Sequence, residues 1–139
     1  HGVVFGGLLQ ERRARPDDQP AVAEMLARLS EQARYQRYFH PAAGSAAWAR
    51  IEAGRLVRPG AEGVTLVATV QFVGAPEVVG VAELTAEAGT TGFGEVAVLV
   101  RDDLQGHGVG LILARQLIAI ARARGVAELH ADMLPSNGT

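Results

Sequence analysis

Residues 96–110 have the sequence VAVLVRDDLQGHGVG, and residues 111–125 continue as LILARQLIAIARARG. Five apolar residues end at a charged break, which is typical of a buried strand that leaves a sheet. The alternating Gly106, Gly108 and Gly110 then let backbone N–H groups approach a ligand with no Cβ in the way. Because a helix N-terminus also presents N–H groups without intrahelical partners, the stretch predicts an anion-binding turn suited to a phosphate or diphosphate.

The residues after this turn have the periodicity of an amphipathic helix. Apolar side chains recur at three- and four-residue spacing, at Val109, Ile112, Leu113, Leu117 and Ile120. Arginines at 122 and 124 suit the negative end of a helix, and the glycine at 125 suits the left-handed residue that often follows it. We therefore expect a helix over about 108–124, with its N-terminus at the glycine turn.

Two common nucleotide-binding motifs do not fit the turn. A P-loop requires a lysine, and all 13 Lys and Arg residues of this chain are arginine. A dinucleotide fingerprint that starts at Gly106 requires a third glycine where the chain has Leu111. The pattern that remains is Q-x-x-G-x-G, formed by Gln105, Gly108 and Gly110 between a strand and a helix.

The flanking segments predict further strands and helices. Residues 65–73 and 78–85 are apolar runs separated by a Gly-Ala-Pro turn, which indicates a hairpin. We expect further strands over about 91–100 and over 128–134. Nearer the N-terminus we expect a strand over 8–13, a helix over about 19–29, and a second helix capped by Ser30.

The order of these elements, with Q-x-x-G-x-G after the third of four consecutive strands and Asn137 after the fourth, resembles the GNAT superfamily of N-acetyltransferases. The segment LSEQARYQRYF at 29–39 is similar to bacterial protein lysine acetyltransferases of the Pat type. The resemblance implies an α/β (α+β) fold, with a mixed, mostly antiparallel central sheet flanked by helices. It implies a single domain over 1–139 that ends after the fifth strand, with the family's C-terminal elements missing.

The resemblance also implies acetyl-CoA as co-substrate. The backbone of Val98, Leu99 and Val100 would pair with the pantetheine arm as a neighbouring strand does. The turn would bind the diphosphate, and the cofactor-binding residues in it are Gln105, Gly106, His107, Gly108, Val109 and Gly110. Asn137 matches a family residue that can contact the CoA arm, and a helix N-cap is the alternative interpretation.

Acetylation of an amine needs a base, because only roughly one lysine side chain in a thousand is uncharged at neutral pH. Glu95 occupies the position of the proposed base in Pat-type enzymes, and we interpret it as the catalytic residue. Alternation places it on one strand face with Ala97 and Leu99, which predicts a partly desolvated carboxylate. The alternative is an ion pair with an arginine. Glu83 is a second candidate base, although its position favours a solvent-facing strand residue.

The acceptor is the least constrained part of the function. The Pat-type resemblance favours a protein lysine, but the same fold serves small amines, aminoglycosides and ribosomal N-termini. The aromatic residues Tyr35, Tyr38, Phe39 and Trp48 could line the acceptor entrance, although helical spacing favours packing. Arg34 and Arg37 favour a solvated helix face over an acidic partner. His130 and Asp132 share a strand face, but two ligands are too few to predict a metal site.

Composition excludes several function classes. The net charge of −2 gives no basic field for nucleic acid, and the absence of cysteine excludes disulfides and thiol catalysis. No apolar run is long enough to predict a membrane span, so we expect a cytoplasmic protein. The sequence leaves the oligomeric state open. It also leaves open a second function, a non-catalytic acyl-CoA-binding sensor or regulatory module.

Overall fold

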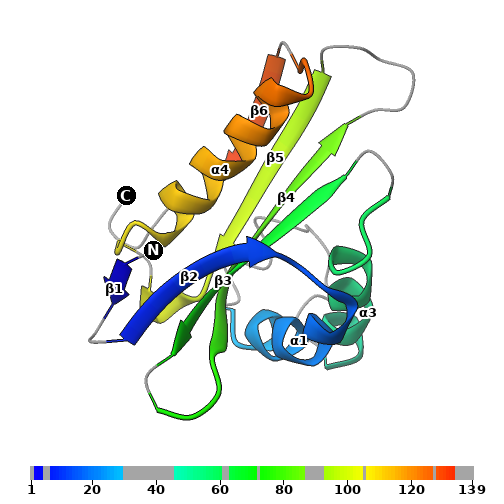
Figure 1. The fold of residues 1–139 in the computed structure, drawn as a ribbon. Coiled ribbons are helices and arrows are strands. Elements are labelled where there is room, and N and C mark those ends of the chain that lie inside the picture. The colour runs from blue at the N-terminus through cyan, green and yellow to red at the C-terminus, as the bar shows by residue number, and fades with distance from the viewer. Residues whose placement is uncertain are drawn as a thin grey trace.

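The computed structural model describes residues 2–4, 7–29, 46–60, 63–71, 73–86, 93–104, 106–126 and 128–133. Within these residues, six strands form one sheet in which each strand lies beside its neighbours in the chain (Figure 1). The strands are β1 (Gly2–Val4), β2 (Gly7–Arg13), β3 (Val64–Gln71), β4 (Glu77–Ala86), β5 (Phe93–Val100) and β6 (Glu128–Met133). Neighbours are antiparallel except β5 and β6, which are parallel. The predicted mixed, mostly antiparallel sheet is confirmed, and β1 is a strand that the sequence did not predict.

The helices of the described residues are η1 (Pro16–Asp18), α1 (Gln19–Ala27), α3 (Ala46–Leu56), η2 (Asp102–Leu104) and α4 (Val109–Ala123), of which η1 and η2 are short 3-10 helices. The helix predicted over 108–124 is confirmed as α4, with Gly108 as its N-cap and Arg124 as its C-cap. Helix α1 ends at Ala27, two residues before the predicted limit. The second predicted helix, beginning at Ser30, lies outside the described residues.

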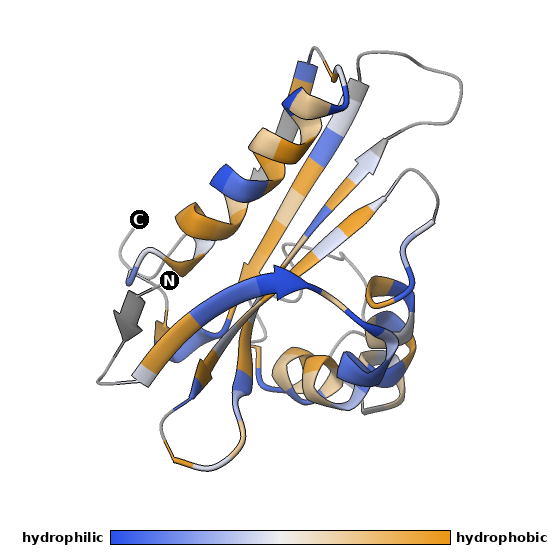
Figure 2. Cartoon of the chain, viewed as in Figure 1, coloured by the Kyte–Doolittle hydropathy of each residue, from blue (hydrophilic) through white to orange (hydrophobic). Residues whose placement is uncertain are grey.

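Two layers of helix cover the two faces of the sheet (Figure 1). On β5, Val96 and Val98 pack into the core beneath α4, whereas Leu99 packs into the core beneath α1 and α3. This alternation is the two-residue period of a strand, which divides the side chains of one strand between two cores. Figure 2 shows that apolar residues follow the middle of the sheet and that the second half of β2 is polar. Both faces of β5 are therefore buried over most of its length.

Strand β4 contains one extra residue relative to its neighbour β3. Ala68 of β3 pairs with Gly80 and Thr69 pairs with Val78, so Val79 of β4 has no register partner on β3. This is a β-bulge, which bends the strand locally. The carbonyl oxygen of Val79 accepts a hydrogen bond of 2.8 Å from the backbone N–H of Arg101, the residue that follows β5. The bulge is thus joined to the point where the chain leaves the sheet.

Candidate cofactor and catalytic site

The glycine turn joins η2 to α4 and has a left-handed backbone at two positions. Gly106 has φ of 84° and Gly108 has φ of 81°. A Cβ at either position would meet nothing within 4 Å, so glycine is needed here for its backbone conformation and not for lack of space. Gly108 makes no side-chain cap, and its carbonyl oxygen accepts the N–H of Ile112 at 3.0 Å. The first N–H groups of α4 precede Ile112 and have no acceptor within the helix.

This geometry is suited to an anion, because an open glycine backbone leads directly into the first N–H groups of α4. Val109 begins α4 and is only 1% exposed, so the first turn of the helix is anchored in the core. His107 is exposed, and its backbone N–H reaches the carbonyl oxygen of Leu104 at 3.4 Å. Gly110 lies in the first turn of α4. Gln105 and Asn137, which the sequence also assigned to cofactor binding, lie outside the described residues.

The expected pantetheine-binding residues lie at the end of β5 nearest this turn. Val98 and Leu99 are buried, and Val100 is half-buried. The described register between β5 and β6 runs from Phe93 to Val98, so Leu99 and Val100 follow its last pair. Val98 is the register partner of Met133 of β6, and the residues that follow Met133 lie outside the described residues.

Glu95 lies near the opposite end of β5 and is exposed. The predicted desolvation of this carboxylate is therefore wrong, although its face partners Ala97 and Leu99 are buried as alternation requires. The core beneath α1 and α3 contains Leu99, and Glu95 lies four residues before it on the strand. Among the described residues Glu95 forms no ion pair with an arginine. Its register partners are Thr85 on β4 and His130 on β6.

Glu83, the second candidate base, is buried and not solvent-facing as predicted. It is 8% exposed, and Arg55 of α3 donates to both of its carboxylate oxygens, at 2.9 and 3.0 Å. These hydrogen bonds raise the pKa of the Arg55 guanidinium, with a smaller contribution from Glu52. Glu83 pairs with Ala97 across the β4–β5 ladder, which makes it the diagonal neighbour of Glu95 on the same face. The structure thus brings the two candidate carboxylates together, but only Glu95 is accessible.

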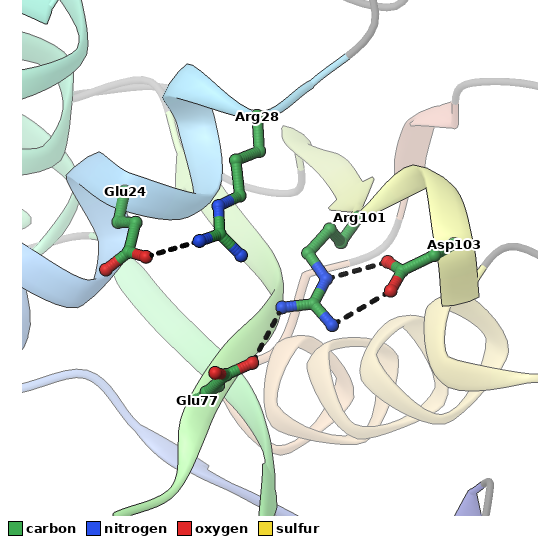
Figure 3. A network of polar contacts seen from close by, with 5 residues as sticks. All are labelled: Glu24, Arg28, Glu77, Arg101 and Asp103. Carbon is green, nitrogen blue, oxygen red and sulfur yellow. Dashed lines mark hydrogen bonds and ion pairs between the residues drawn. The ribbon is translucent and has the colours of Figure 1, made fainter.

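A network of charged side chains surrounds the exit of β5 (Figure 3). Arg101 donates to both oxygens of Asp103 at 2.7 and 3.0 Å, and to Glu77 of β4 at 3.0 Å. Asp103 raises the pKa of Arg101, and Arg101 lowers the pKa of Asp103. On the facing helix α1, Arg28 pairs with Glu24 at 2.8 Å. A cavity of about 80 Å³ lies between α1 and the start of β4, and Arg28 and Arg101 both line it.

The remaining sequence candidates contribute less to the described site. Trp48 is half-buried and packs against the core beneath α1 and α3, which supports the packing interpretation. The candidates between 30 and 45, namely Arg34, Tyr35, Arg37, Tyr38 and Phe39, lie outside the described residues, as do the side chains of His130 and Asp132. Within the described part of the chain, no three His, Cys, Asp or Glu residues are grouped to hold a metal ion. Likewise, no helix there is long and apolar enough to span a membrane.

Arg55, Arg101 and Asp103 belong to the charged groups of the site but were not predicted from the sequence. Arg101 and Asp103 were visible as a charged break after the strand, and their spacing of two residues was a usable local signal. Arg55 gave none, because its partner Glu83 is 28 residues away in the chain.

Comparison with known proteins agrees with this arrangement. Residues 23–138 match the acetyltransferase (GNAT) family. The GNAT domain of S. lividans PAT is similar to this chain, with a TM-score of 0.74 and 27% identity over 95% of this chain and 76% of that chain. A GCN5-related N-acetyltransferase from Kribbella flavida has a TM-score of 0.61 and 22% identity, over 85% of this chain and 67% of its own. A ribosomal-protein-alanine N-acetyltransferase from Brucella melitensis biovar Abortus 2308 has a TM-score of 0.62 and 17% identity, over 94% of this chain and 83% of its own.

The last two similarities concern the fold alone, whereas the family match covers most of the chain. The glycine turn at the start of α4 and the strand that leads into it are the parts of the fold on which the resemblance was based. The chain therefore belongs to the acetyltransferase (GNAT) family, whose members use acetyl-CoA to acetylate an acceptor.

Proposed function

We propose that this chain transfers an acetyl group from acetyl-CoA to a primary amine, with Glu95 as general base. The observation that carries the proposal is that one strand, β5, leads from an accessible carboxylate at one end to a glycine turn and helix N-terminus at the other. Acetyl-CoA supplies the acetyl group as a thioester. The N–H groups at the start of α4 and the turn from Gly106 to Gly110 bind its diphosphate.

The amine nitrogen attacks the thioester carbonyl, a C–N bond forms, and the C–S bond breaks. Glu95 accepts the proton that the amine loses, directly or through one water, and the thiolate leaving group takes up a proton. A backbone N–H near Val98 polarises the carbonyl oxygen during the attack. Glu95 lies three residues from Val98, or about 10 Å along an extended strand, a separation that the Glu95 side chain and one water can bridge.

The acceptor in this proposal is a protein lysine. Its support is the Pat-type segment of the sequence together with the 27% identity to a GNAT domain of a protein called PAT. The ribosomal-protein-alanine acetyltransferase shares only 17% identity, so a ribosomal N-terminus has weaker support. The exposed position of Glu95 is compatible with an acceptor that is itself a folded protein.

The test is calorimetric titration with acetyl-CoA and CoA, followed by acetyl transfer to lysine peptides. Gly108→Glu places a carboxylate against the diphosphate site and should abolish binding. Glu95→Gln should leave CoA binding unchanged and lower kcat by about 10²- to 10⁴-fold. The matched control is Glu24→Gln on α1, which removes another exposed carboxylate.

Binding that survives Gly108→Glu would exclude the turn as the cofactor site. Unchanged kcat in Glu95→Gln would exclude Glu95 as the base. Binding without turnover on any amine would favour the acyl-CoA-binding module.

A further inference from the structure

We propose that Arg101 is a positioning residue for cofactor binding: it locks the glycine turn to the sheet and so holds the turn's N–H groups in place for the diphosphate. The inference rests on the proposed function, because it requires that the turn binds acetyl-CoA. It adds a residue that does not itself contact the diphosphate.

Few interactions within the glycine turn fix its conformation. Gly106 and Gly108 have no side chains, and Gly108 caps α4 without a side-chain hydrogen bond. A glycine backbone loses more conformational freedom on ordering than any other residue. A turn that must be ordered when the ligand arrives binds more weakly than one already in the bound conformation. Its order must therefore come from the residues on either side.

On the C-terminal side, Val109 is buried and fixes the start of α4. On the N-terminal side, Leu104 is buried beneath α4, and Arg101 holds the chain between Leu104 and β5. The carbonyl oxygen of Arg101 accepts the Leu104 N–H at 2.9 Å, and its own N–H donates to Val79 at 2.8 Å. The backbone of this one residue therefore joins η2 to the bulge of β4.

The side chain of Arg101 joins the same two elements a second time. Its guanidinium donates two hydrogen bonds to Asp103 of η2 and one to Glu77 of β4 (Figure 3). Its side chain is 13% exposed, whereas those of Asp103 and Glu77 are 59% and 58% exposed. A planar guanidinium can span two carboxylates in this way, and a lysine ammonium cannot reproduce the bidentate geometry.

Because both carboxylates are exposed, we expect loss of the Arg101 ion pairs to affect the position of the turn more than the stability of the whole chain. Ion pairs with exposed partners contribute little to the stability of a protein, so the loss of this one should not unfold the chain. Its local effect is larger, because Asp103 lies three residues before Gly106. Arg28 also lowers the pKa of Asp103, so the end of α1 belongs to the same electrostatic cluster.

The experiment measures CoA binding by calorimetry and KM and kcat for acetyl-CoA in Arg101→Gln, Asp103→Asn and the double variant. Each single change should weaken CoA binding by about three- to tenfold, the scale expected when one or two groups must be ordered on binding. The double variant should be no weaker than the worse single variant, and kcat at saturating acetyl-CoA should stay within about twofold of wild type. Arg101→Lys should restore only part of the affinity.

The matched control is the pair Arg12 and Asp18, which is also bidentate, through the two Nη atoms of Arg12 at 2.8 Å, and joins β2 to η1. Arg12→Gln should lower the melting temperature without changing CoA affinity. Hydrogen exchange of the Gly106–Gly110 amides should accelerate in Arg101→Gln and not in Arg12→Gln.

The inference is overturned if Arg101→Gln binds CoA as wild type does while Gly108→Glu abolishes binding. It is also overturned if Arg12→Gln weakens binding as much as Arg101→Gln, since that would be a general stability effect. Full binding by Gly108→Glu would instead refute the proposed function, so the two failures are distinguishable.

Discussion

Four glycines offer a controlled test of which turn binds the cofactor. Gly74, Gly106, Gly108 and Gly125 have φ between 81° and 84°, and a Cβ at each of them would meet nothing within 4 Å. Substitution by alanine therefore has the same local cost at every position, because no steric contact differs among them. Only Gly106 and Gly108 lie in the proposed diphosphate turn.

The magnitude follows from the backbone. A left-handed conformation costs a non-glycine residue about 1–2 kcal/mol, and the lower entropy of unfolded alanine offsets about 0.4–1 kcal/mol of this. Each Gly→Ala variant should thus lose about 1 kcal/mol of unfolding free energy, which lowers the melting temperature by about 3–5 °C for a domain of this size. Urea unfolding of the four variants measures this shared loss.

The affinity for CoA should differ between the two variants in the turn, at 106 and 108, and the two outside it, at 74 and 125. A methyl group at 106 or 108 stands where phosphate oxygens would approach the backbone, and loss of one charge-assisted hydrogen bond weakens binding by roughly ten- to a hundredfold. Gly74→Ala, in the β3–β4 turn, and Gly125→Ala, after α4, should bind CoA as wild type does. Calorimetry of all four variants at one temperature makes the comparison. Equal loss of affinity in both pairs, or none in either, would refute the assignment of the turn.

Three further outcomes follow from buried groups. Arg55→Gln should cost about 3 kcal/mol, because it removes both guanidinium hydrogen bonds from a buried carboxylate. Glu83→Gln should cost about 1 kcal/mol, because the guanidinium that it leaves is 50% exposed; equal losses in urea unfolding would contradict this. The hydrogen bond from Arg12 lowers the pKa of Asp18 from its ordinary value, so the Asp18 carboxylate stabilises the fold above that ordinary value and loses its contribution as the pH falls through the folded pKa. Asp18→Asn should therefore cost about 1 kcal/mol at pH 7 and progressively less below about pH 4, as unfolding curves across this range would show. Leu117→Ala, at a fully buried position on α4, should cost about 2–5 kcal/mol by the same assay, and a smaller loss would mean that the core collapses around the site.

The strand, turn and helix around 96–124 could be predicted from the sequence because their signals are local. A strand shows a period of two, a helix shows a period of 3.6, and a glycine at φ above zero marks the junction. For this reason α4 has the predicted limits to within one residue at each end. The short strand β1 gave no such signal, since three residues are too few to show a period.

The charged groups of the site could be predicted only in part, because their partners are distant in the chain. Glu83 was expected in solvent, but α3 brings Arg55 over it from 28 residues away. Glu95 was expected to be partly buried. Strand alternation predicts on which face of the sheet a side chain lies, but not how far the helices extend over that face. The pairing of Arg101 with Glu77, 24 residues apart, also depends on the register of the β4–β5 ladder.

The pairing of β5 on both edges has a consequence for the choice of acyl donor. From Gly94 to Val98 the strand is paired with β4 and β6, so Glu95 and the end of β5 that leads to the glycine turn are held a constant distance apart. A donor must have an arm long enough to reach from one end to the other. Under the proposed function, a compact donor such as an acyl phosphate can occupy one end only, and the chain rejects it by length before any bond is broken.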